Sequence, residues 1–140
     1  MLNPNVYIKK TLDHTAINSL ISLLGRILVV YIFIVAGWGK ITSYADTVLY
    51  MQNMGVAGSL LPLTIFVEFG GGLAILLGLQ TRLAALGLAV FSVLTALIFH
   101  EGHDDAINFM KNLSMAGGLL FIALYGAGRI SLDHFLEKSN

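Results

Sequence analysis

An almost wholly apolar stretch from Pro62 to Leu79 constrains this chain more than any other feature. At about 1.5 Å of rise per residue, a helix of that length is long enough to cross the hydrocarbon core of a bilayer. The stretch nevertheless contains one carboxylate, Glu68, with three glycines close behind it. Because a charge is costly inside a membrane, Glu68 needs a partner, a proton or a water-filled cavity. The stretch therefore predicts a membrane span that contains a candidate functional group.

The composition supports a membrane protein. Hydrophobic residues make up 56% of the 140 residues and charged residues only 11%, whereas roughly a quarter of a soluble domain is charged. Mean hydropathy is +0.81. The formal net charge is zero, which argues against electrostatic binding of nucleic acid. The absence of cysteine excludes disulfides, thiolate nucleophiles and cysteine-ligated iron–sulfur clusters.

Four apolar segments have the length of membrane spans. We expect them over about residues 20–39, 60–79, 83–99 and 112–125, within one membrane domain of residues 20–128. Residues 1–19 form a polar lead, and residues 129–140 form a polar tail. In the connector after the first span, Ser43 could cap a short interfacial helix that Gly55 ends. The predicted fold is all-α: an integral membrane four-helix bundle with a short interfacial helix in the first outer loop.

The orientation follows from the lysines and arginines near the ends of the spans. On one side they are Lys9, Lys10, Arg82, Arg129 and Lys138, and on the other they are Lys40 and Lys111. The more basic side faces the cytoplasm in most membrane proteins. Both termini are therefore expected in the cytoplasm.

Small residues at four-residue spacing predict close helix packing, because they let membrane helices approach one another. The glycines expected at such contacts are Gly37, Gly70, Gly71, Gly72, Gly78 and Gly118.

Arg26 and Glu68 are the two ionisable groups inside the first two spans. The spans are antiparallel, and Arg26 is long enough to reach Glu68 across a depth difference of one or two helical turns. Arg26 also begins a helical stripe with steps of four, three, four and three residues, which consists of Arg26, Val30, Phe33, Gly37 and Lys40. If this stripe faces the bundle, it lines a cleft with polar ends beside Glu68. A quinone or a lipid tail fits that shape, and so does plain helix packing.

The second outer loop contains His100 and His103 among acidic residues. The spacing is that of a weak metal pair, but no third fixed ligand accompanies it. We therefore predict no metal site and keep His100 and His103 only as weak candidates. No span interior contains a histidine, so an autonomous membrane haem protein is not expected.

Several motifs, each weak alone, occur in an order that resembles the DoxX family of small four-span bacterial membrane proteins. The motifs are Gly25-Arg26, Ala36 to Lys40, Tyr50-Met51, Met54-Gly55, Leu63 to Leu79, Thr81-Arg82, His100, Met110 to Asn112 and Gly126 to Asp133. The resemblance covers about residues 20–135 and implies a multi-pass protein of the bacterial inner membrane. The founding members were named as subunits of a terminal quinol oxidase or a thiosulfate–quinone oxidoreductase. Others are linked to membrane assemblies that handle oxidative or thiol stress.

The resemblance also implies a buried polar cluster or ligand site. The positions that match the polar set of the family are Arg26, Lys40, Glu68, His100, Lys111 and Asn112. In our leading hypothesis, Arg26 and Glu68 lie at mid-depth in a cleft between the first two spans. The other four residues form its outer polar rim.

The leading function is a quinone- or lipid-binding accessory component of a membrane redox or stress-response system. Quinone is the one cofactor considered. The expected partners are the lipid bilayer, a membrane redox partner and a second copy of the chain, but not nucleic acid. Whether the chain is an enzyme stays open, since redox chemistry would need a bound cofactor or a partner. The alternatives are a non-catalytic membrane assembly subunit and a small proton-coupled transporter that uses Glu68.

Overall fold

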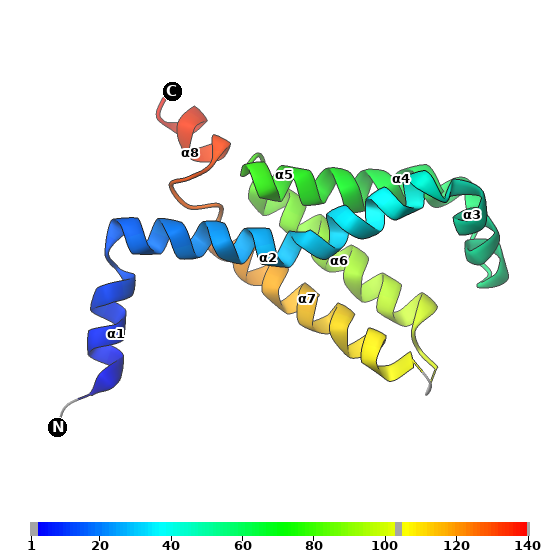
Figure 1. Ribbon diagram of the computed structural model, residues 1–140, viewed down its shortest axis with the longest axis horizontal. Coiled ribbons are helices and arrows are strands. Elements are labelled where there is room, and N and C mark those ends of the chain that lie inside the picture. The colour runs from blue at the N-terminus through cyan, green and yellow to red at the C-terminus, as the bar shows by residue number, and fades with distance from the viewer. Residues whose placement is uncertain (1–2, 103–104, 140) are drawn as a thin grey trace.

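The structure is a computed structural model that describes residues 3–102 and 105–139, and in this part of the chain it is helical with no strands. Four helices are long and apolar enough to cross a membrane: Thr15–Thr42, Gly58–Leu77, Thr81–Phe99 and Ala106–Tyr125. The predicted all-α membrane four-helix bundle is therefore confirmed. A short α1, Pro4–Leu12, precedes the first span and turns sharply away from it in Figure 1.

The first span is α2, Thr15–Thr42. Its buried residues are Ser19, Arg26, Val30, Phe33 and Gly37, so the stripe read from the sequence does face the bundle. Val30 and Phe33 belong to the hydrophobic core, together with Ile75, Leu88 and Leu119 from the other three spans. The rest of α2 exposes large apolar side chains, as expected for a surface that faces lipid tails.

The predicted interfacial helix is present as α3, Tyr44–Asn53. It ends where expected, because Gly55 adopts a left-handed conformation with φ of 75°, which costs glycine little. Met51 is the buried residue of α3, so the helix packs against the bundle by one face. Figure 1 shows α3 at the opposite end of α2 from α1.

The second span is a chain of four helical pieces that continue one another without a break. They are η1 (Gly58–Leu60), α4 (Leu61–Ile65), η2 (Phe66–Gly70) and α5 (Gly71–Leu77). The segment η2 is a π-helical turn that contains Glu68. Such wide turns inside α-helices are frequent at functional sites.

The span ends in a glycine turn. Gly78 has φ of 71°, and the N–H groups of Gly78 and Leu79 donate to the carbonyls of Ile75 and Ala74. This pattern of two reversed hydrogen bonds is the Schellman motif, which stops a helix and satisfies its last carbonyls. Gly78 is thus a turn glycine.

The third and fourth spans are α6 (Thr81–Phe99) and α7 (Ala106–Tyr125), which pack side by side (Figure 1). The buried face of α6 includes Ala85, Ala89, Ser92 and Ala96, and side chains this small let the two backbones approach closely. The helix α7 begins at Ala106, ahead of the start of the fourth span expected near residue 112. Its first turns therefore extend the helix into the polar loop.

The chain then returns to the other end of the bundle. Gly126 ends α7 with φ of 78°, and the tail forms α8, Leu132–Glu137. Figure 1 shows α8 beside the turn between α5 and α6 and on the same side of the molecule as α1. We call this the terminal end, and we call the end that holds α3 and the loop between α6 and α7 the loop end.

Candidate functional site

Glu68 is paired with Lys40 toward the loop end. Nζ of Lys40 lies 2.6 Å from Oε2 of Glu68, and the Glu68 side chain is 8% exposed. The pair depends on a close crossing of backbones, because Gly37 of α2 lies against Phe69 of η2. Lys40 lies about one helical turn after Gly37 and so shares its face of α2. The close crossing therefore brings the ammonium group to the carboxylate.

Arg26 does not pair with Glu68, although the sequence allowed that pairing. The Arg26 side chain is buried and donates to the carbonyls of Ile75 (3.0 Å), Leu76 (3.4 Å) and Ile130. Ile75 and Leu76 end the second span at the terminal end, where carbonyls lack the i+4 N–H partners of a helix interior. The carbonyl of Ile75 accepts from the N–H of Gly78 as well as from Arg26. Glu68 lies about two turns deeper. Arg26 therefore binds the nearer acceptors, at the negative end of the helix dipole.

The Lys40–Glu68 pair opens into a groove of about 490 Å³. Residues from α3, α4, η2 and α6 line it, and most of them are apolar; His100 lies at its edge just beyond α6. The cleft expected between the first two spans is thus replaced by a groove between the second and third spans, with α3 beside it. The reason is that the stripe on α2 is filled by helix packing, which leaves only Lys40 to reach the groove.

Two aromatic side chains border the groove near His100. The rings of Tyr50 on α3 and Phe99 on α6 are stacked, with centroids 5.7 Å apart, and both line the groove. Such pairs are worth about 0.5 to 1.5 kcal/mol beyond the area they bury. The stack holds α3 against the end of α6, so that the groove has a wall where a four-helix bundle alone would leave it open.

His100 begins a polar chain along the loop end. Its Nδ1 bonds to the Asp105 carboxylate, which also accepts a hydrogen bond from Asn108. The hydrogen bond from His100, and to a smaller extent that from Asn108, lowers the pKa of Asp105 below its ordinary value. With Nδ1 bonded to a carboxylate, Nε2 of His100 is the ring nitrogen left to bond a ligand. Lys111 continues the chain by donating to Asn108 at 2.6 Å.

The comparisons with known proteins now decide the family. The DoxX family model matches residues 21–101, which is more than half of the chain. The chain belongs to the DoxX family. It is 53% identical to the inner membrane protein YqjF of Escherichia coli strain K12 over 119 residues, which are 83% of this chain and 92% of YqjF. No solved structure matches the chain at a significant level.

A second relative is also an inner membrane protein. The chain is 35% identical over 131 residues to the inner membrane protein YphA of the same strain, covering 86% of this chain and 94% of YphA. Both relatives are named as inner membrane proteins. Together with four long apolar helices, the comparisons describe a multi-pass DoxX-family membrane protein.

The structure divides the six polar residues of the DoxX-like set among three places. Lys40, Glu68 and His100 line the groove. Lys111 and Asn112 lie on α7, where the buried Asn112 amide donates to the carbonyl of Asn108 at 3.0 Å. Arg26 lies at the terminal end, bonded to backbone carbonyls. The set is therefore one candidate ligand site and two structural contacts.

The glycines expected at packing contacts also fall into classes. Added methyl groups at Gly37, Gly71 and Gly72 would crowd Phe69, Leu88 and Ile34, respectively. Gly78 forms the turn after α5, and a methyl group there would meet Ser131 and Arg26. Gly70 and Gly118 have room for a methyl group at ordinary contact distance.

Two site features were missed from the sequence. The π-helical turn has no compositional signature beyond the nearby glycines, although an acidic residue inside an apolar span was a hint. Asp105 is one of the loop acids that the sequence offered as oxygen ligands beside His100 and His103, but its hydrogen bond to His100 was not predicted. Among the residues that the structure describes, no group of three or more potential ligands could hold a metal ion. His103 lies outside the described residues.

Proposed function

We propose that this DoxX-family protein binds an isoprenoid quinone or a lipid in the groove between α3, α4, η2 and α6. The observation that carries the proposal is a largely apolar groove of about 490 Å³ with the Lys40–Glu68 pair and His100 among its walls. Ligand pockets commonly measure about 300–1,000 Å³ and combine apolar walls with a few polar groups. A long apolar molecule with polar head atoms matches both the walls and the polar residues.

The polar residues suit such a head group. The Lys40 ammonium has hydrogens beyond the one directed at Glu68 and can donate to a carbonyl or phosphate oxygen. His100, oriented by Asp105, can accept a hydrogen bond from a hydroxyl group through Nε2. In this proposal the chain binds and orients its ligand, and a membrane redox partner supplies any electron transfer, since the chain has no cysteine.

The orientation of the chain is part of the proposal. Of the lysines and arginines counted by sequence, the five that include Arg82 and Arg129 belong to the terminal end and two to the loop end. By the positive-inside tendency, the terminal end faces the cytoplasm and the groove opens toward the outer half of the bilayer.

A groove-filling variant tests the proposal without touching a charge. Gly87 on α6 lines the groove, and a methyl group added there meets nothing within 4 Å. Gly87→Leu should therefore occupy the groove with little strain. Gly117→Leu on α7 is the matched control, because Gly117 also has open space around it and is not part of the groove.

The measurement is the quinone and lipid content of each protein, purified from native membranes into nanodiscs and extracted for mass spectrometry. Wild type and Gly117→Leu should retain one ligand at close to one molecule per chain, and Gly87→Leu should lose most of it. Retained quinone would identify a quinone site, and retained lipid alone would identify a lipid site. Equal content in all three proteins would contradict the proposal.

The ion pair supports one further candidate function. Lys40 and Glu68 join α2 to the second span, so a non-catalytic assembly subunit would also keep them. That function predicts that Gly87→Leu has no effect on ligand content or activity. It also predicts that loss of the pair disrupts association with a partner in native pull-down experiments.

A further inference from the structure

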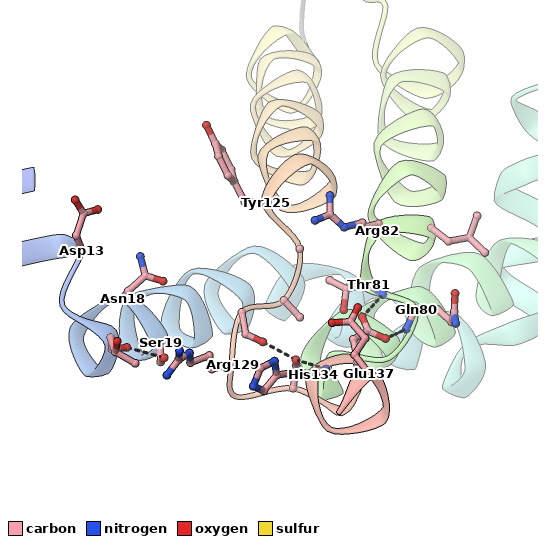
Figure 2. Close-up of a pocket in the computed structure, with 17 residues that line it drawn as sticks. Asp13, Asn18, Ser19, Gln80, Thr81, Arg82, Tyr125, Arg129, His134 and Glu137 are labelled. Carbon is pink, nitrogen blue, oxygen red and sulfur yellow. Dashed lines mark hydrogen bonds between the residues drawn. The ribbon is translucent and has the colours of Figure 1, made fainter. Parts of the chain in front are cut away.

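A second cavity, of about 500 Å³, lies at the terminal end and shares no residue with the groove (Figure 2). Its walls come from the start of α2, the start of α6, the end of α7 and the tail that leads to α8. These are the ends of three membrane spans. The cavity is therefore at the boundary between lipid and water, where phospholipid head groups lie.

The cations of this cavity are at the span ends. Arg82, in the first turn of α6, donates through Nη1 to the carbonyls of Ala123 (2.9 Å) and Leu124 (2.5 Å). These bonds fix the guanidinium group, which Figure 2 shows beside the end of α7. They leave donors on Nε and Nη2. Arg129 adds a second guanidinium group from the loop after α7. Two such groups are suited to a phosphate ester.

The cavity is also lined by three carboxylates, which come from outside the spans. Asp133 is already bonded to the N–H groups of Gln80 (2.7 Å) and Thr81 (2.9 Å). Asp13 and Glu137 are exposed, and the ion pairs formed among the described residues do not include them. Besides the two arginines, the cavity therefore has two exposed carboxylates, Asp13 and Glu137, which lie at opposite sides of it (Figure 2).

We propose that this cavity binds the head group of an amine-bearing zwitterionic phospholipid. Arg82 and Arg129 contact the phosphate, and Glu137 on α8 contacts the primary ammonium group, while Asp13 lies at the opposite side of the cavity (Figure 2). The exposed Tyr125 lies at the same boundary, where tyrosine commonly packs against lipids. The proposal concerns a different cavity from the groove and does not depend on the proposed function.

The balance of charge favours a zwitterion over the other phosphate esters. Phosphatidylglycerol has the phosphate but no cation for Glu137. Phosphatidylcholine has a cation without N–H donors, so it cannot form a hydrogen bond to this carboxylate. Free phosphate could meet the arginines, but it would gain nothing from the carboxylates and would have no apolar tail to bury.

The test is native mass spectrometry of the full chain in detergent with added phosphatidylethanolamine, phosphatidylcholine or phosphatidylglycerol of identical acyl chains. Wild type should prefer phosphatidylethanolamine to each of the others by about fivefold, the scale of a partly exposed charge-assisted hydrogen bond. Glu137→Gln should abolish the preference over phosphatidylcholine. Arg129→Gln should weaken the binding of all three lipids.

Matched controls remove the same charges elsewhere. Glu101→Gln is at the loop end, and Lys9→Gln is on α1 outside the cavity, so neither should change lipid preference. The proposal is overturned by equal binding of the three lipids or by a preference for phosphatidylglycerol. It is also overturned if Glu137→Gln keeps the wild-type preference, or if inorganic phosphate at low concentration displaces the bound lipid. Should Arg129→Gln fail to fold, the selectivity of Glu137→Gln decides alone.

Discussion

Gly37 and Gly39 lie two residues apart on α2 and have opposite surroundings. A methyl group at Gly37 would lie 2.7 Å from Cβ of Phe69 and 3.0 Å from its backbone, whereas one at Gly39 would meet nothing within 4 Å. Gly37→Ala must therefore move α2 away from η2. We expect it to lower the free energy of unfolding in micelles by about 1 to 3 kcal/mol, the usual cost of overpacking.

Gly39→Ala is the control for that experiment. It should leave stability unchanged or raise it slightly, because alanine favours a helix more than glycine does. If both variants unfold at the same denaturant concentration, the close crossing of α2 and η2 is not present in the protein.

The Lys40–Glu68 pair can be tested by a double-mutant cycle. Removing one partner leaves either the buried Glu68 or the half-buried Lys40 unpaired, so Lys40→Met and Glu68→Gln should each destabilise by about 1 to 3 kcal/mol. The double variant should cost less than the sum of the two. The measurement is the free energy of unfolding of the four proteins, and strict additivity would show that the two side chains do not interact.

Arg26 gives the matched comparison for that cycle. Because its partners are carbonyl groups and not Glu68, Arg26→Met should show no coupling with Glu68→Gln. The result distinguishes the observed Lys40–Glu68 pair from the Arg26–Glu68 pair that the sequence allowed.

The tail element α8 is attached to the start of α6 by one carboxylate. Asp133 accepts from the N–H groups of Gln80 and Thr81, while its own N–H donates to the carbonyl of Gly78 at 2.7 Å. Gln80 has φ of 47°, which is uncommon for a residue other than glycine. The hydrogen bond to Asp133 helps to stabilise this conformation, and the carboxylate also lies at the positive end of the α6 dipole.

This attachment should depend on pH. Partial burial raises the pKa of Asp133, but the hydrogen bonds from Thr81 and Gln80 and the charge of Arg26 outweigh it, so the pKa is lowered overall. A lowered pKa stabilises the folded form above the ordinary value of about 4, and the contribution is lost as the pH falls through the folded-state value. Hydrogen exchange at the amides of Gln80 and Thr81 should therefore become less protected below about pH 4.

Asp133→Asn should reduce that protection at neutral pH and remove its pH dependence. Glu137→Gln, a neighbouring change on α8, should preserve both. Unchanged protection in Asp133→Asn would mean that the carboxylate does not hold the start of α6.

At the scale of elements, sequence patterns predicted the helix ends, because these depend on residues close together in the chain. The end of α3 at Gly55 and the stop at Gly126 result from residues that favour left-handed or irregular backbone. The partner of Arg26 and the place of the groove were not predicted, because they depend on which helix ends come together in three dimensions. The π-helical turn at Glu68 was also missed, since no residue pattern distinguishes it from a regular turn.

At the scale of the whole molecule, the proposed orientation in the membrane can be tested by labelling from one side. The chain has no cysteine, so single cysteines can be introduced without a background. Glu101→Cys at the loop end should react with a membrane-impermeant maleimide in intact spheroplasts. Ser139→Cys at the terminal end should react only after the membrane is opened, and the reverse pattern would overturn the proposed orientation.

The global fold was the part most open to prediction. Four apolar segments, a polar lead and tail, and glycines at helix crossings are enough to specify a four-span bundle. The structure brings Lys40, Glu68 and His100 together around the groove, although the sequence had placed Glu68 with Arg26. Of the other three residues, Lys111 and Asn112 lie on α7 and Arg26 lies at the terminal end.

The wide turn around Glu68 makes the length of the second span as important as its composition. Every residue added to or removed from a regular helix rotates the remainder of that helix by about 100°. The wide turn already holds one residue more than a regular turn, so deleting one residue from Phe66–Gly70 should restore a regular ladder with little rotation of the flanking pieces. Inserting a residue should instead turn Leu61 or Ile75, both fully buried, away from its contacts. Insertions in this short segment should therefore be tolerated far less well than a single deletion.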